Sequence, residues 1–177
     1  MFCHLPLQYP DELLYSVIAR YLIYIGAKNG YFVANHIFGR ETRAQIDLPS
    51  SLDAVSERTW HIWGMYGEEI AEQLTLFPYY AHYIPNARAK QCLKALLGDI
   101  GHGIHYRLGV NSQRIKAPRS LRFCETCREA DLSKYGETYW HRSHQLAGVL
   151  VCPEHGDRLI DTHVPMRSKG LSDYIDA

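Results

Sequence analysis

The stretch Leu121–Leu159 reads LRFCETCREADLSKYGETYWHRSHQLAGVLVCPEHGDRL and holds two closely spaced pairs of metal-binding side chains. Two residues separate Cys124 from Cys127, and the same gap separates Cys152 from His155. This spacing lets both side chains of a pair reach one ion at about 2.0–2.3 Å, and thiolates with an imidazole favour zinc over magnesium or calcium. Four protein ligands close a tetrahedral shell, so the pattern predicts one structural Zn²⁺ ion.

Two alternatives for these cysteines are a disulfide and free thiols that pack as small hydrophobic side chains. A disulfide leaves the repeated spacing and His155 unexplained. The other cysteines, Cys3 and Cys92, are expected to be reduced. The N-terminus lacks a basic, apolar signal sequence, and no window approaches the ~18–20 apolar residues of a membrane span, so we expect a cytoplasmic protein without membrane contact.

The composition is that of a globular protein, because 46% of the residues are apolar and can form a core. Lys and Arg together number 19, as do Asp and Glu, so the chain has no net charge with neutral histidines. This balance argues against a protein that binds polyanions over its whole surface, although it leaves local basic patches open.

The first two-thirds of the chain predict mostly helices. Leu14, Ile18 and Tyr21 belong to one apolar stripe, with Asp11 and Glu12 in the first turn and Gly26 at the end. The expected helices cover about residues 11–26, 31–38, 51–63, 68–74 and 87–97, and Ser50 with Asp53 resembles a capping box for the third.

The sequence after residue 119 predicts short strands at about 139–140, 149–151 and 159–160, with little helix. The fold class is therefore mainly α: a helical domain followed by a small zinc-finger or zinc-ribbon-like module with short β hairpins. The first three helices could include a helix-turn-helix, with the helix from Ser51 reading a DNA groove; a plain helical bundle is the alternative.

A segment rich in arginine and lysine, residues 107–122, joins the two parts; we call it the basic connector. It has no acidic residue, and its cations are Arg107, Arg114, Lys116, Arg119 and Arg122. This pattern fits a solvated linker and equally an arm that contacts phosphates.

Three classes of function are compatible with these features. A metalloenzyme is the weakest, because four ligands leave no open metal position and no HExxH motif supplies a base; His141, His144 and His163 are more typical of surface or packed histidines. A nucleic-acid-binding module fits the helices, the zinc site and the basic connector. A protein adaptor fits the many aromatic residues between Trp60 and Tyr83.

The chain resembles the TniQ/TnsD family, the target-site selectors of heteromeric, multi-component bacterial transposons. The resemblance rests on five stretches that together span most of the sequence. They are Leu5-Pro6 with Tyr9 to Ser16 and Ala19-Arg20; Leu48 to Ser50 with Leu52; Thr75 to Ala81; Leu121 to Cys127 with Tyr135 to Glu137 and Tyr139-Trp140; and Leu150 to Pro153 with His155-Gly156. Glu125 departs from the proline that often follows the first cysteine in this family.

The resemblance implies a non-catalytic protein that marks the insertion site and recruits an AAA+ ATPase regulator, which in turn licenses the transposase. TnsD-like members bind a chromosomal attachment site, whereas TniQ proteins of CRISPR-associated transposons dock on an RNA-guided effector complex. The implied location is the bacterial cytoplasm, at the nucleoid. Known members are longer, so we expect the TniQ region of a longer selector: a helical domain over residues 1–110, the connector and zinc module over 111–165, and the start of a following segment over 166–177.

Overall fold

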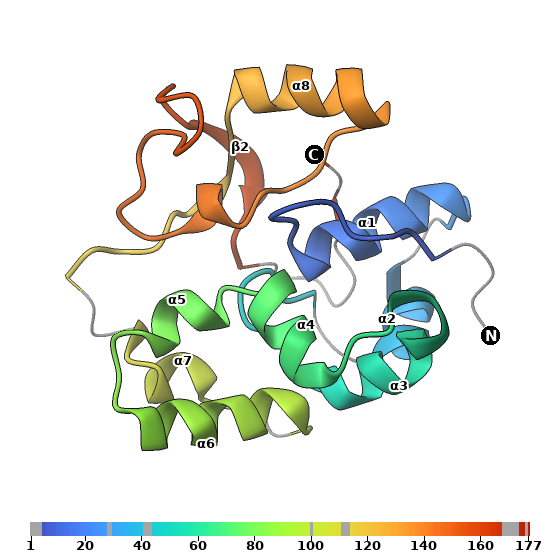
Figure 1. The fold of residues 1–177 in the computed structure, drawn as a ribbon, viewed down its shortest axis with the longest axis vertical. Helices are drawn as coiled ribbons and strands as arrows, with labels where there is room; N and C mark the ends of the chain where they lie inside the picture. Colours follow the sequence, from blue (N-terminus) through green and yellow to red (C-terminus); the bar gives the residue numbers. More distant parts are fainter. Residues whose placement is uncertain are drawn as a thin grey trace.

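The computed structural model describes residues 5–27, 30–40, 44–99, 101–110, 114–167, 174–175 and 177, so Cys3 lies outside the described residues. As predicted, the fold is mainly helical. Figure 1 shows α8 at the top of the molecule, above the other helices, with strand β2 beside it. The elements are α1 (Leu14–Tyr24), α2 (Gly30–Phe38), α3 (Leu52–Trp63), α4 (Gly67–Leu74), α5 (Phe77–Ala81), α6 (Asn86–Leu97), α7 (Ile104–Arg107), β1 (Ser120–Phe123), α8 (Glu125–Tyr135), the 3₁₀ turn η2 (Ser143–Gln145) and β2 (Ile160–Pro165). Among the described residues, no helix has the length and apolar character needed to cross a bilayer.

Helix α1 begins three residues later than the sequence predicts. Asp11 has a positive φ of 58°, and Glu12 turns into the interior, where its carboxylate pairs with the Arg20 guanidinium at 2.9 Å. The apolar stripe from Leu14 is helical as predicted, but the acidic first turn is wrong. The buried ion pair with Arg20 fixes Glu12 more strongly than the helix dipole would fix a carboxylate in the first turn of an exposed helix.

Helix α3 is confirmed, but its predicted capping box of Ser50 and Asp53 is wrong. Ser51 precedes the helix with a left-handed φ of 64°, and no side chain caps the first turn. The Ser51 hydroxyl instead accepts a hydrogen bond from Arg40 Nε at 2.8 Å and lies 3.0 Å from Asp99 Oδ1. Partners distant in sequence therefore replace the local cap.

The helices pack around one apolar core that also receives residues from the C-terminal part. Helix α3 contacts α2, α4 and α6. Ile18, Leu52 and Ile70 are fully buried in the core, and Leu121 of β1 and Trp140 join the same cluster. The division into residues 1–110, 111–165 and 166–177 stays a prediction, and the two larger regions share this core.

The C-terminal part contains more helix than the sequence predicts. Helix α8 follows Cys124 directly and ends at Gly136, whose φ of 77° stops it. Strands β1 and β2 pair antiparallel, with Phe123 opposite Ile160, so the expected strand near 159–160 is confirmed from Ile160 onward. Residues 139–140 lie outside any strand, and from the expected strand 149–151 only one residue forms a bridge. The two-residue ligand spacing is compatible with the start of a helix, which the prediction overlooked.

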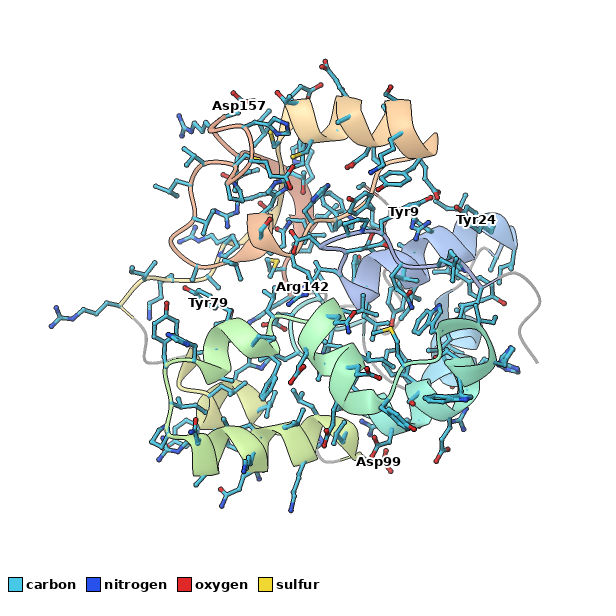
Figure 2. All side chains as sticks on the ribbon, in the orientation of Figure 1. Tyr9, Tyr24, Tyr79, Asp99, Arg142 and Asp157 are labelled. Carbon is cyan, nitrogen blue, oxygen red and sulfur yellow. The ribbon has the colours of Figure 1, made fainter. Side chains whose placement is uncertain are left out.

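Arg142 fastens the C-terminal part to the end of α4. Its guanidinium donates to the backbone oxygens of Thr75 and Glu72, each at 2.9 Å, and also to the Gln73 oxygen. These carbonyls lack partners within the helix, so the arginine satisfies the end of α4. Figure 2 shows Arg142 where the upper and lower parts of the molecule meet.

A buried arginine also fastens α1 to the residues that follow α8. Arg20 donates to Glu137 at 2.7 Å in addition to its pair with Glu12. The hydroxyls of Tyr9 and Tyr24 donate to the same Glu137 carboxylate, and Figure 2 shows both tyrosines beside α1. Burial raises the pKa of the Glu137 carboxyl, but hydrogen bonds from Tyr24, Tyr9 and Arg20 outweigh burial and hold this pKa below its usual value.

Candidate metal centre

Two tight turns bring the four predicted ligands together beside α8. Cys124 immediately precedes α8 and Cys127 lies in its first turn. Cys152 and His155 lie in a turn that a hydrogen bond from Gly156 N to Cys152 O closes at 2.9 Å. Gly156 has a φ of 73°, which a residue with a side chain adopts only with strain.

The distances between the ligand atoms fit a tetrahedral metal ion. The Nδ1 atom of His155 lies 3.8, 3.3 and 3.6 Å from the sulfurs of Cys124, Cys127 and Cys152, and the last two sulfurs are 3.5 Å apart. A tetrahedron with metal–ligand bonds of about 2.0–2.3 Å has edges of about 3.3–3.8 Å. The cluster of these four residues, which we call the metal-binding cluster, can therefore hold a metal ion.

The electrostatics of the thiols favour a cation at this point. Burial, with the neighbouring Cys152, raises the pKa of the Cys127 thiol well above its usual value, and burial also raises that of Cys124. Burial opposes ionisation of Cys152 too, but the backbone N–H groups of His155 and Glu154 donate to its sulfur and lower its pKa. Neighbouring thiolates repel one another, and a divalent ion removes that penalty.

A layer of stacked histidines supports the cluster on its inner side. His144 is buried, and its Nε2 lies 3.7 Å from Cys127 Sγ. Burial lowers the pKa of His144 to about 4, so a neutral ring with its proton on Nε2 would donate to the thiolate. His141 stacks on His144 with ring centroids 4.7 Å apart, and its Nε2 pairs with Asp131 at 2.8 Å. Cys127, His141 and His144 also form a second group of donors close enough for a metal.

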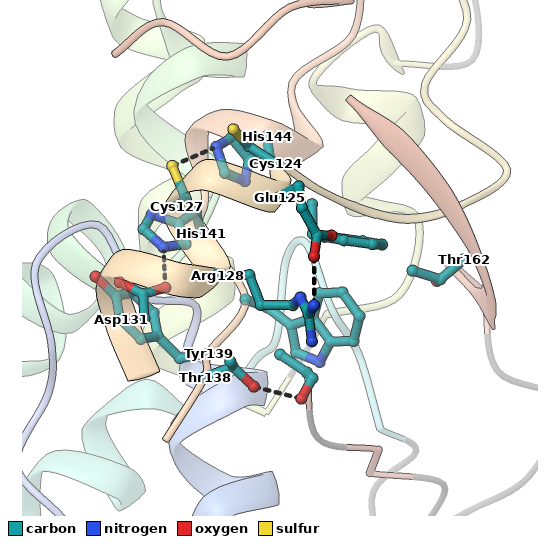
Figure 3. Close-up of a pocket in the computed structure, with 13 residues that line it drawn as sticks. Cys124, Glu125, Cys127, Arg128, Asp131, Thr138, Tyr139, His141, His144 and Thr162 are labelled. Carbon is teal, nitrogen blue, oxygen red and sulfur yellow. Dashed lines mark hydrogen bonds and ion pairs between the residues drawn. The ribbon is translucent and has the colours of Figure 1, made fainter. Parts of the chain in front are cut away.

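A cavity of about 260 Å³ lies against this layer, and Figure 3 shows the contacts between Cys127 and His144 and between His141 and Asp131 along its wall. Glu125 and Arg128 form an ion pair at its edge. An ion held by all four cluster residues has no free tetrahedral position, so a molecule in this cavity would touch ligand side chains rather than the metal.

Replacing His144 by leucine should weaken metal binding about 10- to 100-fold, the usual cost of losing a hydrogen bond to a metal ligand. His144→Gln should lose less, because its amide can still donate to Cys127 Sγ. Competition with a chromophoric chelator measures the affinity. His163→Leu, an exposed histidine on β2, is the control and should behave as wild type. Equal affinities for the leucine and glutamine variants would refute a donor role for His144.

The structure separates the cations of the basic connector into exposed and buried groups. Arg107, Arg114, Lys116 and Arg119 are exposed. Arg122 is buried, and its guanidinium donates to the backbone oxygens of Val149 and Leu146 at 2.6 and 2.9 Å. Its expected role as a phosphate contact is therefore not supported, because this side chain already holds the loop after η2. Leu121 and Arg122 are neighbours and both are buried, so strand alternation gives no sequence signal for this inward orientation.

Sequence reasoning missed two other residues. His144 is a packed histidine, as the sequence suggests, but it also contacts a ligand sulfur, which the sequence does not reveal. Arg167 follows β2 and lines a cleft with Lys116 and Arg119. No local pattern marks Arg167, because only the pairing of β1 with β2 brings it beside the connector.

Comparisons with known proteins agree with this architecture. The family model described as TniQ matches residues 5–159, which include all four residues of the metal-binding cluster. The transposon Tn7 transposition protein TnsD of Escherichia coli is 32% identical over 165 residues, covering 89% of this chain and 32% of that protein. The chain thus spans about a third of the length of this curated relative. On the family match over most of its length, the chain belongs to the TniQ family.

Proposed function

We propose that this chain is the target-site selection module of a DNA transposition protein and acts without catalysis. The observation that carries the proposal is the TniQ match over residues 5–159, together with the similarity to a transposition protein, TnsD. In this role the protein binds DNA at the attachment site and recruits an AAA+ ATPase regulator, through which the transposase subunits act. It works at the bacterial nucleoid.

In the proposed mechanism, the metal-binding cluster holds one structural Zn²⁺ and does no chemistry. The four residues would surround the ion, and the ion would supply the folding free energy that a small module lacks. The buried Arg122 and the half-buried Arg142 then fix the backbone around the module. The connector thereby presents its exposed cations on a rigid support rather than on a free linker.

The proposed DNA contacts are the exposed cations of the connector: Arg107, Arg114, Lys116 and Arg119. The chain has no net charge, so DNA binding requires a local surface of this kind. Each phosphate contact releases counterions, which makes the affinity fall as salt rises. This dependence gives a direct test.

Replacing Arg114, Lys116 and Arg119 together by glutamine should flatten the plot of log affinity against log salt concentration for short duplex DNA. Each lost phosphate contact should lower the slope by about 0.9. Fluorescence anisotropy of labelled DNA at several salt concentrations measures the slope.

The matched control removes the same charge elsewhere. Arg88, Lys90 and Lys94 are exposed on α6, outside the connector, and their triple glutamine variant should keep the wild-type slope. Equal slopes for wild type and the connector variant would show that the connector does not contact phosphates.

An aromatic surface favours a second candidate function, docking on a protein assembly. Trp60 of α3 and Tyr66 before α4 contact each other with ring centroids 4.7 Å apart and ring planes tilted by 47°, although they are 44% and 64% exposed. Exposed aromatic pairs of this kind are common anchors of protein interfaces. The partner would be the AAA+ regulator or, alternatively, an RNA-guided CRISPR effector complex. Loss of binding to one of these partners in Trp60→Ala, with DNA binding intact, would identify this role.

A further inference from the structure

The end of β2 brings a third cation beside two cations of the basic connector. Ser120 pairs with Pro165, and Met166 N donates to the Arg119 oxygen at 3.0 Å. Arg167 is held from its other side by an antiparallel bridge to Gln45. The backbone near Arg119 and Arg167 is therefore fixed by pairing, which positions the two residues on one rigid edge.

A cleft of about 340 Å³ opens along this edge, lined by the cations Lys116, Arg119 and Arg167. Asp47 is the carboxylate among the lining residues. It is already engaged, because Oδ2 lies 2.7 Å from His105 Nε2 and Oδ1 accepts the backbone N–H of Leu48 at 2.9 Å. Three cations thus share one cleft with one carboxylate that has partners of its own, an arrangement that favours binding of an anion.

The shape and the walls of the cleft suit a phosphate group. Arginine offers a planar fork of N–H donors that matches phosphate oxygens, and lysine adds a point charge. Pro118, Pro165 and Met166 add apolar surface to the walls of the cleft. The three cations offer many N–H donors. The two oxygens of a carboxylate would accept fewer of these hydrogen bonds than the oxygens of a phosphate.

A buried hydroxyl lies within electrostatic reach of the same cleft. Tyr80 is fully buried, and its OH makes no hydrogen bond to any part of the chain that the structure describes. Burial is the main cause that raises the pKa of Tyr80; Asp47 also raises it, and Arg167 acts in the opposite direction. Tyr80 also belongs to α5, the helix preceded by Leu76, whose N–H donates to the Asp47 oxygen at 3.0 Å.

We propose that Lys116, Arg119 and Arg167 form a binding site for one phosphate group, supplied by the nucleic-acid backbone. The choice of nucleic acid as the source rests on the proposed function, whereas the phosphate chemistry rests on the cleft alone. The proposed site differs from the basic connector in two residues. Arg167 lies outside the connector but lines the cleft, whereas Arg114 lies in the connector but does not line the cleft.

The test compares wild type with Arg167→Gln, Arg167→Lys and the control Arg88→Gln on two probes, duplex DNA and inorganic phosphate. On DNA, Arg167→Gln should lower the salt slope by about 0.9 and weaken binding, while Arg167→Lys should keep the slope because it keeps the charge. Inorganic phosphate should raise the melting temperature of wild type and of Arg88→Gln, but not that of Arg167→Gln. Lys116→Gln provides a second variant in the same cleft if Arg167→Gln folds poorly.

The outcomes separate this inference from the proposed function. If wild type binds DNA with a steep salt slope that neither Arg167→Gln nor Lys116→Gln changes, the cleft is not the phosphate site, and the proposed function stands. If wild type does not bind DNA but phosphate stabilises it through Arg167, the site binds free phosphate, and nucleic acid is the wrong source. If neither probe responds to Arg167→Gln and Lys116→Gln, the phosphate site is refuted.

Discussion

Replacing Cys152 by serine should remove the metal and unfold the residues around it. The apolar cluster at this point is small: besides the three cysteines it contains Leu159, with Val149 packed against it. Such a cluster cannot replace the ~10–16 kcal/mol of apparent binding free energy that structural zinc supplies. Metal analysis should find less than half an equivalent of zinc in Cys152→Ser. Circular dichroism should show that this variant melts at a lower temperature than wild type. A strong chelator should have the same effect on wild type.

The control for this experiment is Cys92→Ser, the same chemical change at a buried cysteine of α6 outside the metal-binding cluster. It should keep the metal, although loss of a buried thiol lowers stability somewhat. Full metal content and an unchanged melting transition in Cys152→Ser would mean that the four residues are not the ligands.

Replacing Arg20 by methionine should lower the free energy of unfolding by about 3–5 kcal/mol, the usual cost of leaving a buried charge without its partner. Glu12 is completely buried, and burial raises the pKa of its carboxyl even though Arg20 acts in the opposite direction. Burying the Glu12–Arg20 pair therefore costs free energy, and burying Glu12 without Arg20 costs more. Glu137 also loses a donor. Urea denaturation followed by circular dichroism measures the change.

Two variants sharpen this test. Arg128→Met removes the cation of the exposed pair with Glu125 and should change stability little, because solvent screens that pair. The double variant Glu12→Gln with Arg20→Met should recover part of the loss, since the amide carries no charge. A loss in Arg20→Met as small as that in Arg128→Met would show that the contacts of Arg20 with Glu12 and Glu137 contribute little to stability.

The parts of the fold that the sequence predicted correctly depend on short-range patterns. The stripe from Leu14 and the spacing of Cys124, Cys127, Cys152 and His155 are local, and the structure has the helix and the clustered ligands. The glycine after Trp63 ends α3 as expected, because it adopts a left-handed φ.

The wrong predictions concern side chains whose partners are remote in sequence. Glu12 looked like an exposed helix start, but it pairs with Arg20, which also reaches Glu137, 117 residues away from Arg20 in the chain. Ser50 was expected to cap α3, but its hydroxyl accepts a hydrogen bond from Arg40. Arg122 looked like one more cation of the connector, but β1 turns it inward. Local propensity cannot anticipate these contacts, because the whole fold creates them.

We propose that the surface formed by Lys116, Arg119 and Arg167, supported by the metal-binding cluster, directs transposition to a chosen site. The most direct measurement is sequencing of insertion sites in cells that carry the transposon with the protein containing this chain, either wild type or the triple variant Lys116→Gln, Arg119→Gln, Arg167→Gln. Wild type should concentrate insertions at one target, whereas the variant should lose this concentration and keep its metal and its melting temperature. An unchanged insertion profile in the variant would contradict this proposal.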